Sequence, residues 1–162
     1  MRPTWDSTFM DICKTISKRS TCAKIKTSSI IVKDNNIISI GYNGVPSKME
    51  HCEHYWEVIW LINDYDISWE DFLKTERFRE EHHNWSYYNE LHAEMNAILQ
   101  CKTDTTNSVM YTLLSPCINC SKCIISSKIK KVIYLTEYKR DFESSKKILE
   151  ENGIVLEKYN SS

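Results

Sequence analysis

The chain has 162 residues, of which 41% are hydrophobic and 27% charged, so its length suits one folded domain and is too short for two of ordinary size. Its net charge of −1 argues against an obligate binder of duplex nucleic acid, because such domains are strongly basic. No apolar run reaches the ~18 residues of a membrane span, and the first residues do not resemble a signal peptide. A cytoplasmic protein, in the host cell if the chain is viral, is therefore expected.

The first half of the chain predicts a helix followed by a hairpin. Residues 4–19 carry apolar side chains at helical spacing. The β-branched segments 28–32 and 37–40 flank an Asn-rich turn, as the strands of a hairpin do. Residues 41–46 are predicted to be a loop that leaves the second strand. It holds two of the three glycines of the chain, so an unusual backbone geometry is expected there.

Residues 48–90 are polar, acidic and aromatic, and we predict that they form an insertion between core elements. Within it, 54–62 is predicted to be a short helix, and Ser68–Asp71 has the pattern of a capping box that opens a second helix. The rest of the chain alternates, with helices predicted at 91–100, 117–127 and 142–152 and strands at 109–114, 131–136 and 154–159. This alternation favours an α/β sheet covered on both faces, within a single domain over residues 1–162.

The residues that indicate chemistry are His92-Ala93-Glu94 and the later Pro116-Cys117-Ile118-Asn119-Cys120. Seven cysteines and a Cys-x-x-Cys spacing favour metal binding over a disulfide framework in a reducing compartment. One imidazole and two thiolates are three zinc ligands, which leaves a fourth tetrahedral position open, as in catalytic sites. Both cysteines are predicted in the first turn of a helix, where the helix dipole favours thiolates.

Glu94 is predicted to be the proton carrier of this site. It is too near His92 in the sequence to be well placed as a fourth ligand of the same zinc ion. Zinc lowers the pKa of a coordinated water toward ~7, so a neighbouring carboxylate can take its proton and pass it to a leaving group. This is the chemistry of hydrolytic deamination. The rival interpretation, a zinc-stabilised binding module without chemistry, has no need of a carboxylate at this position.

The order His-x-Glu then Pro-Cys-x-x-Cys is the signature of the zinc nucleobase deaminases, and three stretches narrow the resemblance. They are Gly41-Tyr42-Asn43-Gly44 with Pro46, residues 89–98, and residues 111–117. On these the chain resembles the deoxycytidylate (dCMP) deaminases, above all those of phages and viruses, over about residues 8–157. The resemblance implies a three-layer α/β/α fold with a central five-stranded mixed sheet. It also implies hydrolysis of dCMP to dUMP, the precursor for thymidylate synthesis.

By the same resemblance, Asn43 is expected to bind the sugar and base, and backbone near Ala93 and Ser115 to contact the cytosine edge. Lys24 and Lys26 are candidates for the 5′-phosphate, although most lysines are solvated surface groups. Tyr138 is expected to cover the base or to be an ordinary packed surface tyrosine.

The resemblance further implies a second, structural zinc that orders the insertion, because some phage dCMP deaminases have one. The matching positions are Cys22, Cys52, His82 and Glu90. Independently, a polar insertion with little apolar material of its own would be ordered by a metal. Two alternatives stay open: Cys22 as a buried small hydrophobe, and other histidines as ligands, namely His51, His54 and His83.

Regulation and assembly are also expectations from the resemblance. Relatives of this kind are often homohexamers, activated by dCTP with Mg and inhibited by dTTP, through a site that includes Gly41, Tyr42, Asn43 and Gly44. Two other substrates remain open. One is dCTP, accepted beside dCMP by a bifunctional enzyme. The other is a polynucleotide (tRNA or single-stranded DNA), which would require a basic groove that the net charge of −1 disfavours.

Overall fold

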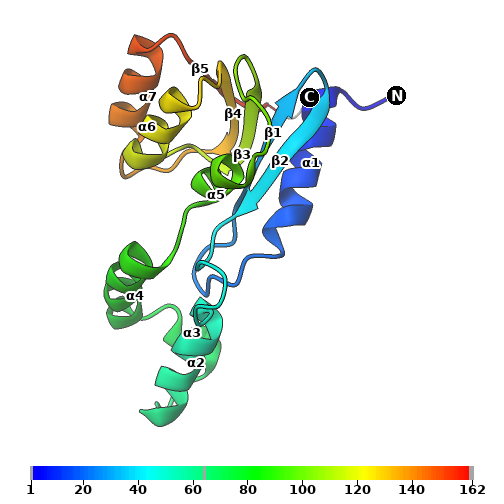
Figure 1. Cartoon of the computed structure of the whole chain (residues 1–162). Coiled ribbons are helices and arrows are strands. Elements are labelled where there is room, and N and C mark those ends of the chain that lie inside the picture. Colours follow the sequence, from blue (N-terminus) through cyan, green and yellow to red (C-terminus); the bar gives the residue numbers. More distant parts are fainter. Residues whose placement is uncertain (1, 64, 161–162) are drawn as a thin grey trace.

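The computed structural model describes residues 2–63 and 65–160, and its centre is a five-stranded sheet (Figure 1). The strands are β1 (Ser28–Lys33), β2 (Asn36–Tyr42), β3 (Val109–Leu114), β4 (Lys131–Thr136) and β5 (Val155–Lys158). Their order is β2-β1-β3-β4-β5, with β1 antiparallel to both neighbours and β3, β4 and β5 mutually parallel. Four strands therefore end at the same edge of the sheet, which is where ligands bind in open α/β sheets.

Helices cover both faces of the sheet, as the alternating pattern predicts. The helices are α1 (Trp5–Ser17), α2 (Cys52–Ile62), α3 (Trp69–Phe72), α4 (Glu76–Asn89), α5 (Ala93–Gln100), α6 (Ile118–Ser126) and α7 (Phe142–Glu151). Alternate residues of a strand point to opposite faces, so Ile30 packs toward α1 while its neighbour Ile31 packs toward α5, α6 and α7. The expected three-layer mixed α/β fold is confirmed.

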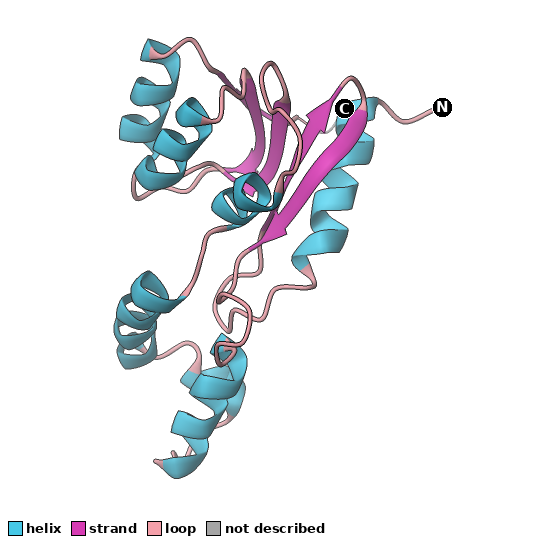
Figure 2. Cartoon of the chain, in the orientation of Figure 1, coloured by secondary structure: helices cyan, strands magenta, loops and turns pink. Residues whose placement is uncertain are grey.

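The insertion is a helical unit beyond the sheet edge where β2 ends, comprising α2, α3 and α4 (Figure 2). We predicted little apolar material in it, and this was wrong: Trp56, Phe72 and Phe78 are buried together with Cys22 and Cys52. The helix α4 was not predicted either, because its mostly polar sequence carries only a weak apolar pattern. No helix in the described part of the chain is both long and apolar enough to cross a membrane.

The predicted loop 41–46 begins inside a strand, since β2 continues to Tyr42. The expected backbone constraint is present, because a Cβ atom on Gly41 would lie 2.3 Å from the Ala97 nitrogen and 2.4 Å from the Ala93 oxygen. Two polar contacts hold the same helix against the strand: Ser39 Oγ donates to Ala97 O at 2.6 Å, and Asn96 Nδ2 donates to Tyr42 O at 2.8 Å. These contacts with strand β2 therefore fix the position of α5 against the sheet.

Replacing Gly41 by alanine is expected to destabilise the fold by about 3 kcal/mol. The atoms that would clash belong to the backbone of α5, so they cannot move aside as a flexible side chain can. Urea unfolding measures the loss. Gly44→Ala is the control, since a Cβ there meets only the Thr21 hydroxyl, at 3.7 Å. Equal stability of the two variants would contradict the close approach of β2 and α5.

Candidate active site

His92, Cys117 and Cys120 meet at the starts of two helices. His92 is the N-cap residue of α5, Cys117 is the N-cap of α6, and Cys120 lies in the first turn of α6. Each Sγ atom is 3.4 Å from His92 Nδ1, and the three candidate ligand atoms lie within 4.8 Å of one another. Both helices begin one or two residues later than predicted, so Cys117 precedes its helix instead of opening it.

The ligand atoms of this cluster share protons through close contacts, and their donor types suit a divalent cation. The hydrogen bond from Cys120 lowers the pKa of Cys117 to about 4, and the same contact, with burial, raises the pKa of Cys120. The hydrogen bond with Cys117 raises the pKa of His92 to about 9. One imidazole and two sulfur ligands converging from fixed helix starts are a donor set typical of zinc with one open position. The residues present therefore fit a zinc ion.

Glu94 lies in the first turn of α5, beside the cluster. Its side chain is buried, and Cys120 Sγ is 3.6 Å from Glu94 Oε2. Burial raises the pKa of Glu94 to about 7. A carboxyl group whose pKa lies near the working pH can both accept and donate a proton.

The cluster and Glu94 open into a cavity of about 470 Å³. Its walls come from the strand ends at the sheet edge, from α4, and from the loop after β4. Four of the expected substrate residues line it: Lys24, Asn43, Ser115 and Tyr138. Lys26 does not line it and instead forms an ion pair with Glu53 at 2.8 Å, so the structure does not support Lys26 as a phosphate ligand. Ala93 is fully buried as the first residue of α5.

Two pocket residues are already engaged within the fold. The Asn43 amide donates to Ile25 O at 2.7 Å and accepts from Thr27 N at 2.9 Å, so it orders the segment before β1. The Ser115 N–H donates to Thr136 O at 2.9 Å, and Ser115 Oγ accepts from Tyr138 N at 2.7 Å. The Ser115 N–H is therefore not available to a bound nucleobase. The Ser115 carbonyl takes no part in these two bonds and is available.

The loop expected to bind an effector also has internal contacts. Gly44 exchanges two backbone hydrogen bonds with Leu91, at 2.9 and 3.1 Å, directly before His92. The role of Gly41, Tyr42, Asn43 and Gly44 in effector binding stays a prediction.

Sequence reasoning missed several residues of this pocket, notably His83, Ser86 and Tyr87 on α4 and Arg140 after β4. Arg140 Nη1 lies 2.9 Å from His83 Nε2. Burial and the nearby positive charges of Arg140 and Lys24 lower the pKa of His83. None of these residues belongs to a spaced motif, so a single sequence offered no signal for them.

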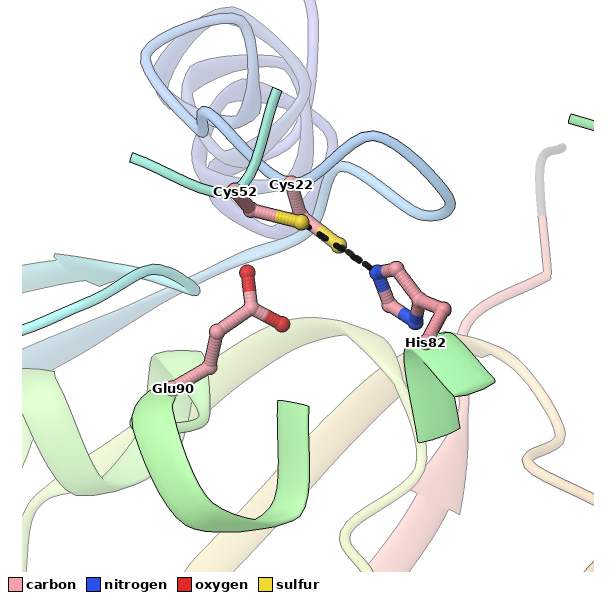
Figure 3. A group of neighbouring side chains, drawn as sticks. All are labelled: Cys22, Cys52, His82 and Glu90. Atoms are coloured by element: carbon pink, nitrogen blue, oxygen red, sulfur yellow. Dashed lines mark hydrogen bonds between the residues drawn. The ribbon is translucent and has the colours of Figure 1, made fainter. Parts of the chain in front are cut away.

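A second cluster joins the insertion to the rest of the chain. Cys22, Cys52, His82 and Glu90 offer four candidate ligand atoms within 4.8 Å of one another, and their side chains point toward one another in Figure 3. His82 Nε2 is 3.5 Å from Cys22 Sγ and 3.3 Å from Cys52 Sγ. The four residues come from three separate parts of the chain, and the fold brings their side chains together.

Charge and unsatisfied polarity both fit a cation in this second cluster. The contact with Cys52 lowers the pKa of Cys22 to about 4, while the pKa of Cys52 is raised. Glu90 accepts from Ser86 Oγ at 2.6 Å, but its buried Oε1 atom has no hydrogen-bond partner among the described residues. Four converging protein ligands are typical of a structural zinc site. The competing histidines lie elsewhere and contact other groups, namely Thr21, Glu50 and Arg140.

Comparison with known proteins agrees with this fold and site. The family described as "Cytidine and deoxycytidylate deaminase zinc-binding region" matches residues 3–136. The deoxycytidylate deaminase of Enterobacteria phage T2 is 34% identical over 93% of this chain and 89% of its own length. That of Saccharomyces cerevisiae is 32% identical over 98% of this chain and 46% of its own length.

Among solved structures, the dCMP deaminase of cyanophage S-TIM5 in complex with dCMP and dUMP matches with a TM-score of 0.70 and 26% identity, over 98% of this chain and 99% of that one. The fold and the His-Cys-Cys cluster thus define a zinc-dependent deaminase. The chain belongs to the cytidine and deoxycytidylate deaminase family.

Proposed function

We propose that the protein hydrolyses dCMP to dUMP and ammonia. The observation that carries this proposal is the placement of Glu94 beside His92, Cys117 and Cys120 at one wall of a nucleotide-sized cavity. Similarity to the phage T2 enzyme, and to a cyanophage enzyme whose structure holds dCMP and dUMP, supports this substrate. The dUMP formed would supply thymidylate synthesis.

In this proposal His92, Cys117 and Cys120 hold zinc, which when bound supplies a water of lowered pKa as the nucleophile. Glu94 accepts the proton that this water loses and gives it to the ring nitrogen beside C4 of cytosine. A second proton transfer releases the amino group as ammonia, so one water is consumed for each dUMP formed. Burial of Glu94 supports this role, because it keeps the proton affinity of the carboxylate close to what both transfers need.

The base would lie between the helix starts and the loop after β4. The Ala93 N–H, at the first position of α5, has no acceptor within the helix and is our candidate for the cytosine edge, together with the Ser115 carbonyl. Asn43 orders this wall through its bonds to Ile25 and Thr27, and the second N–H of its amide group is our candidate for the sugar. Tyr138 also lines the cavity and would cover the base.

The substrate is tested by ammonia release from dCMP, dCTP, deoxycytidine and a short cytosine-containing oligonucleotide. We expect turnover of dCMP to exceed that of the other three at equal concentration. Preference for dCTP would favour the bifunctional alternative, and activity on the oligonucleotide alone would favour a polynucleotide deaminase. Zinc binding without any turnover would favour the binding module.

We also propose that Cys22, Cys52, His82 and Glu90 hold a second zinc with a structural role. Its support is the convergence of the four side chains and the unpartnered Glu90 Oε1 atom. The insertion has a hydrophobic core of its own. Such a zinc would therefore fix the position of the insertion against the rest of the chain and contribute less to the folding of the insertion itself.

Cys52→Ala is expected to remove one zinc equivalent and to lower Tm about 5 °C further than Cys13→Ala does. Both thiols are completely buried, so Cys13→Ala controls for the loss of packing, and only Cys52 belongs to a cluster. Metal analysis and thermal unfolding give the two readouts. A Cys52→Ala protein with the full zinc content would refute the second site.

The remaining expectations concern regulation, assembly and location. We infer activation by dCTP with Mg, inhibition by dTTP and a homohexamer from the family resemblance alone, and a cytoplasmic location from the cysteine pattern, which favours metal binding in a reducing compartment. We likewise infer one domain over residues 1–162, with residues 48–90 as its insertion. Assays with added effectors and the molecular mass in solution test the first three.

A further inference from the structure

The rim of the substrate cavity carries a pair of basic side chains that no motif indicated. Arg140 belongs to the loop after β4, and His83 belongs to α4 of the insertion. Both line the cavity, and Arg140 Nη1 is 2.9 Å from His83 Nε2. A guanidinium group has no acceptor atom, so the imidazole nitrogen is the acceptor of this bond. The pair therefore links the core to the insertion across the pocket.

Arg140 is also available to an anion. Among the described residues it forms no ion pair with a carboxylate, and neither does Lys24, which also lines the cavity. Guanidinium carries five N–H donors in a fixed fork, so the bond to His83 leaves donors free. An unpaired arginine at the rim of a cavity, with its orientation held by a neutral acceptor, is suited to bidentate contact with a phosphate.

The position of Arg140 along its loop is consistent with the length of a nucleotide. The Tyr138 N–H bonds to Ser115 Oγ, which places the start of this loop against the segment that leads to Cys117. Arg140 follows two residues later, a distance of at most about 7 Å along the chain, and is exposed at the rim. A base bound at Glu94 would therefore direct its 5′ end outward, toward Arg140.

We propose that Arg140 binds the 5′-phosphate of the nucleotide and that His83 is the positioning residue that orients it. This inference rests on the proposed function and assigns the phosphate to the loop after β4 in place of Lys26. It also gives the insertion a part in substrate selection, because His83 comes from α4. The next residue toward the N-terminus, His82, points into the second cluster (Figure 3), which holds this helix in place.

The test compares the affinity of the zinc-loaded full chain for dUMP and for deoxyuridine, which lacks the phosphate, by calorimetry. Arg140→Ala is expected to weaken dUMP binding about 10- to 100-fold and to change deoxyuridine binding less than about 3-fold. Lys139→Ala, an adjacent exposed cation that does not line the cavity, is the matched control and should change neither. Unchanged deoxyuridine affinity also verifies that the variant is folded.

The role of His83 is separated by two substitutions. Gln supplies an acceptor for the Arg140 bond and Leu does not, so His83→Leu should weaken dUMP binding several-fold while His83→Gln retains most of it. Equal weakening of dUMP and deoxyuridine by Arg140→Ala would overturn the inference, because it would mean that Arg140 shapes the pocket as a whole. No weakening of either would overturn it as well. If the wild-type protein bound neither ligand, the proposed function itself would fail.

Discussion

Replacing Glu94 with glutamine is expected to lower kcat for dCMP about 100- to 10,000-fold, the range by which a positioned proton carrier accelerates such a step. Glutamine keeps the shape of the side chain but cannot take or return a proton. Because the amide does not remove any candidate zinc ligand, KM and zinc content should change little. The measurement is ammonia release under saturating dCMP, with metal analysis of the same samples.

Glu143→Gln is the matched control for that experiment. Glu143 lies in the first turn of α7 as Glu94 lies in the first turn of α5, but it is exposed and does not line the cavity. Its replacement should leave kcat unchanged. Normal turnover by Glu94→Gln would mean that another group carries the proton and that the proposed chemistry is wrong.

The second large effect is expected at Cys120, which is completely buried where α6 begins. Cys120→Ala leaves one imidazole and one thiol for the zinc. Loss of a group that merely supports a ligand costs about 10- to 100-fold in metal affinity, so loss of the ligand itself should cost more. We expect the variant to lose one zinc equivalent and its turnover of dCMP.

Cys123→Ala provides the comparison for Cys120. Cys123 lies three residues further along α6, is only partly buried, and belongs to neither cluster. This variant should keep its full zinc content and its turnover. A Cys120→Ala protein that bound zinc as tightly as the wild type would show that the metal is held elsewhere.

Much of the fold could be predicted because local patterns and tertiary packing agree. The β-branched residues of β1 and the regularly spaced apolar residues of α1 and α7 face the hydrophobic core, as their patterns predict. The zinc cluster could be predicted for a similar reason, since His92, Cys117 and Cys120 sit at helix starts that the sequence itself indicates. A site whose residues lie in short motifs can be predicted from a single sequence.

Other features depended on contacts between distant segments. The mostly polar helix α4 is held by Phe78 packing against Trp56, and no periodic pattern indicates this. The expected phosphate ligand Lys26 pairs instead with Glu53, whereas Arg140 and His83 meet across 57 residues of chain. The side chain of Asn43, expected on the nucleotide, lines the cavity and also bonds to the backbone before β1. Such pairings arise only once the chain has folded.

The most direct test of the account is conversion of dCMP by the purified protein, followed as dUMP formed and ammonia released, before and after removal of zinc with a chelator. We predict one ammonia for each dUMP, loss of turnover on chelation, and recovery when zinc is restored. Turnover that persisted in metal-free protein, or a zinc-loaded protein that left dCMP unchanged, would contradict the assignment of a zinc-dependent dCMP deaminase.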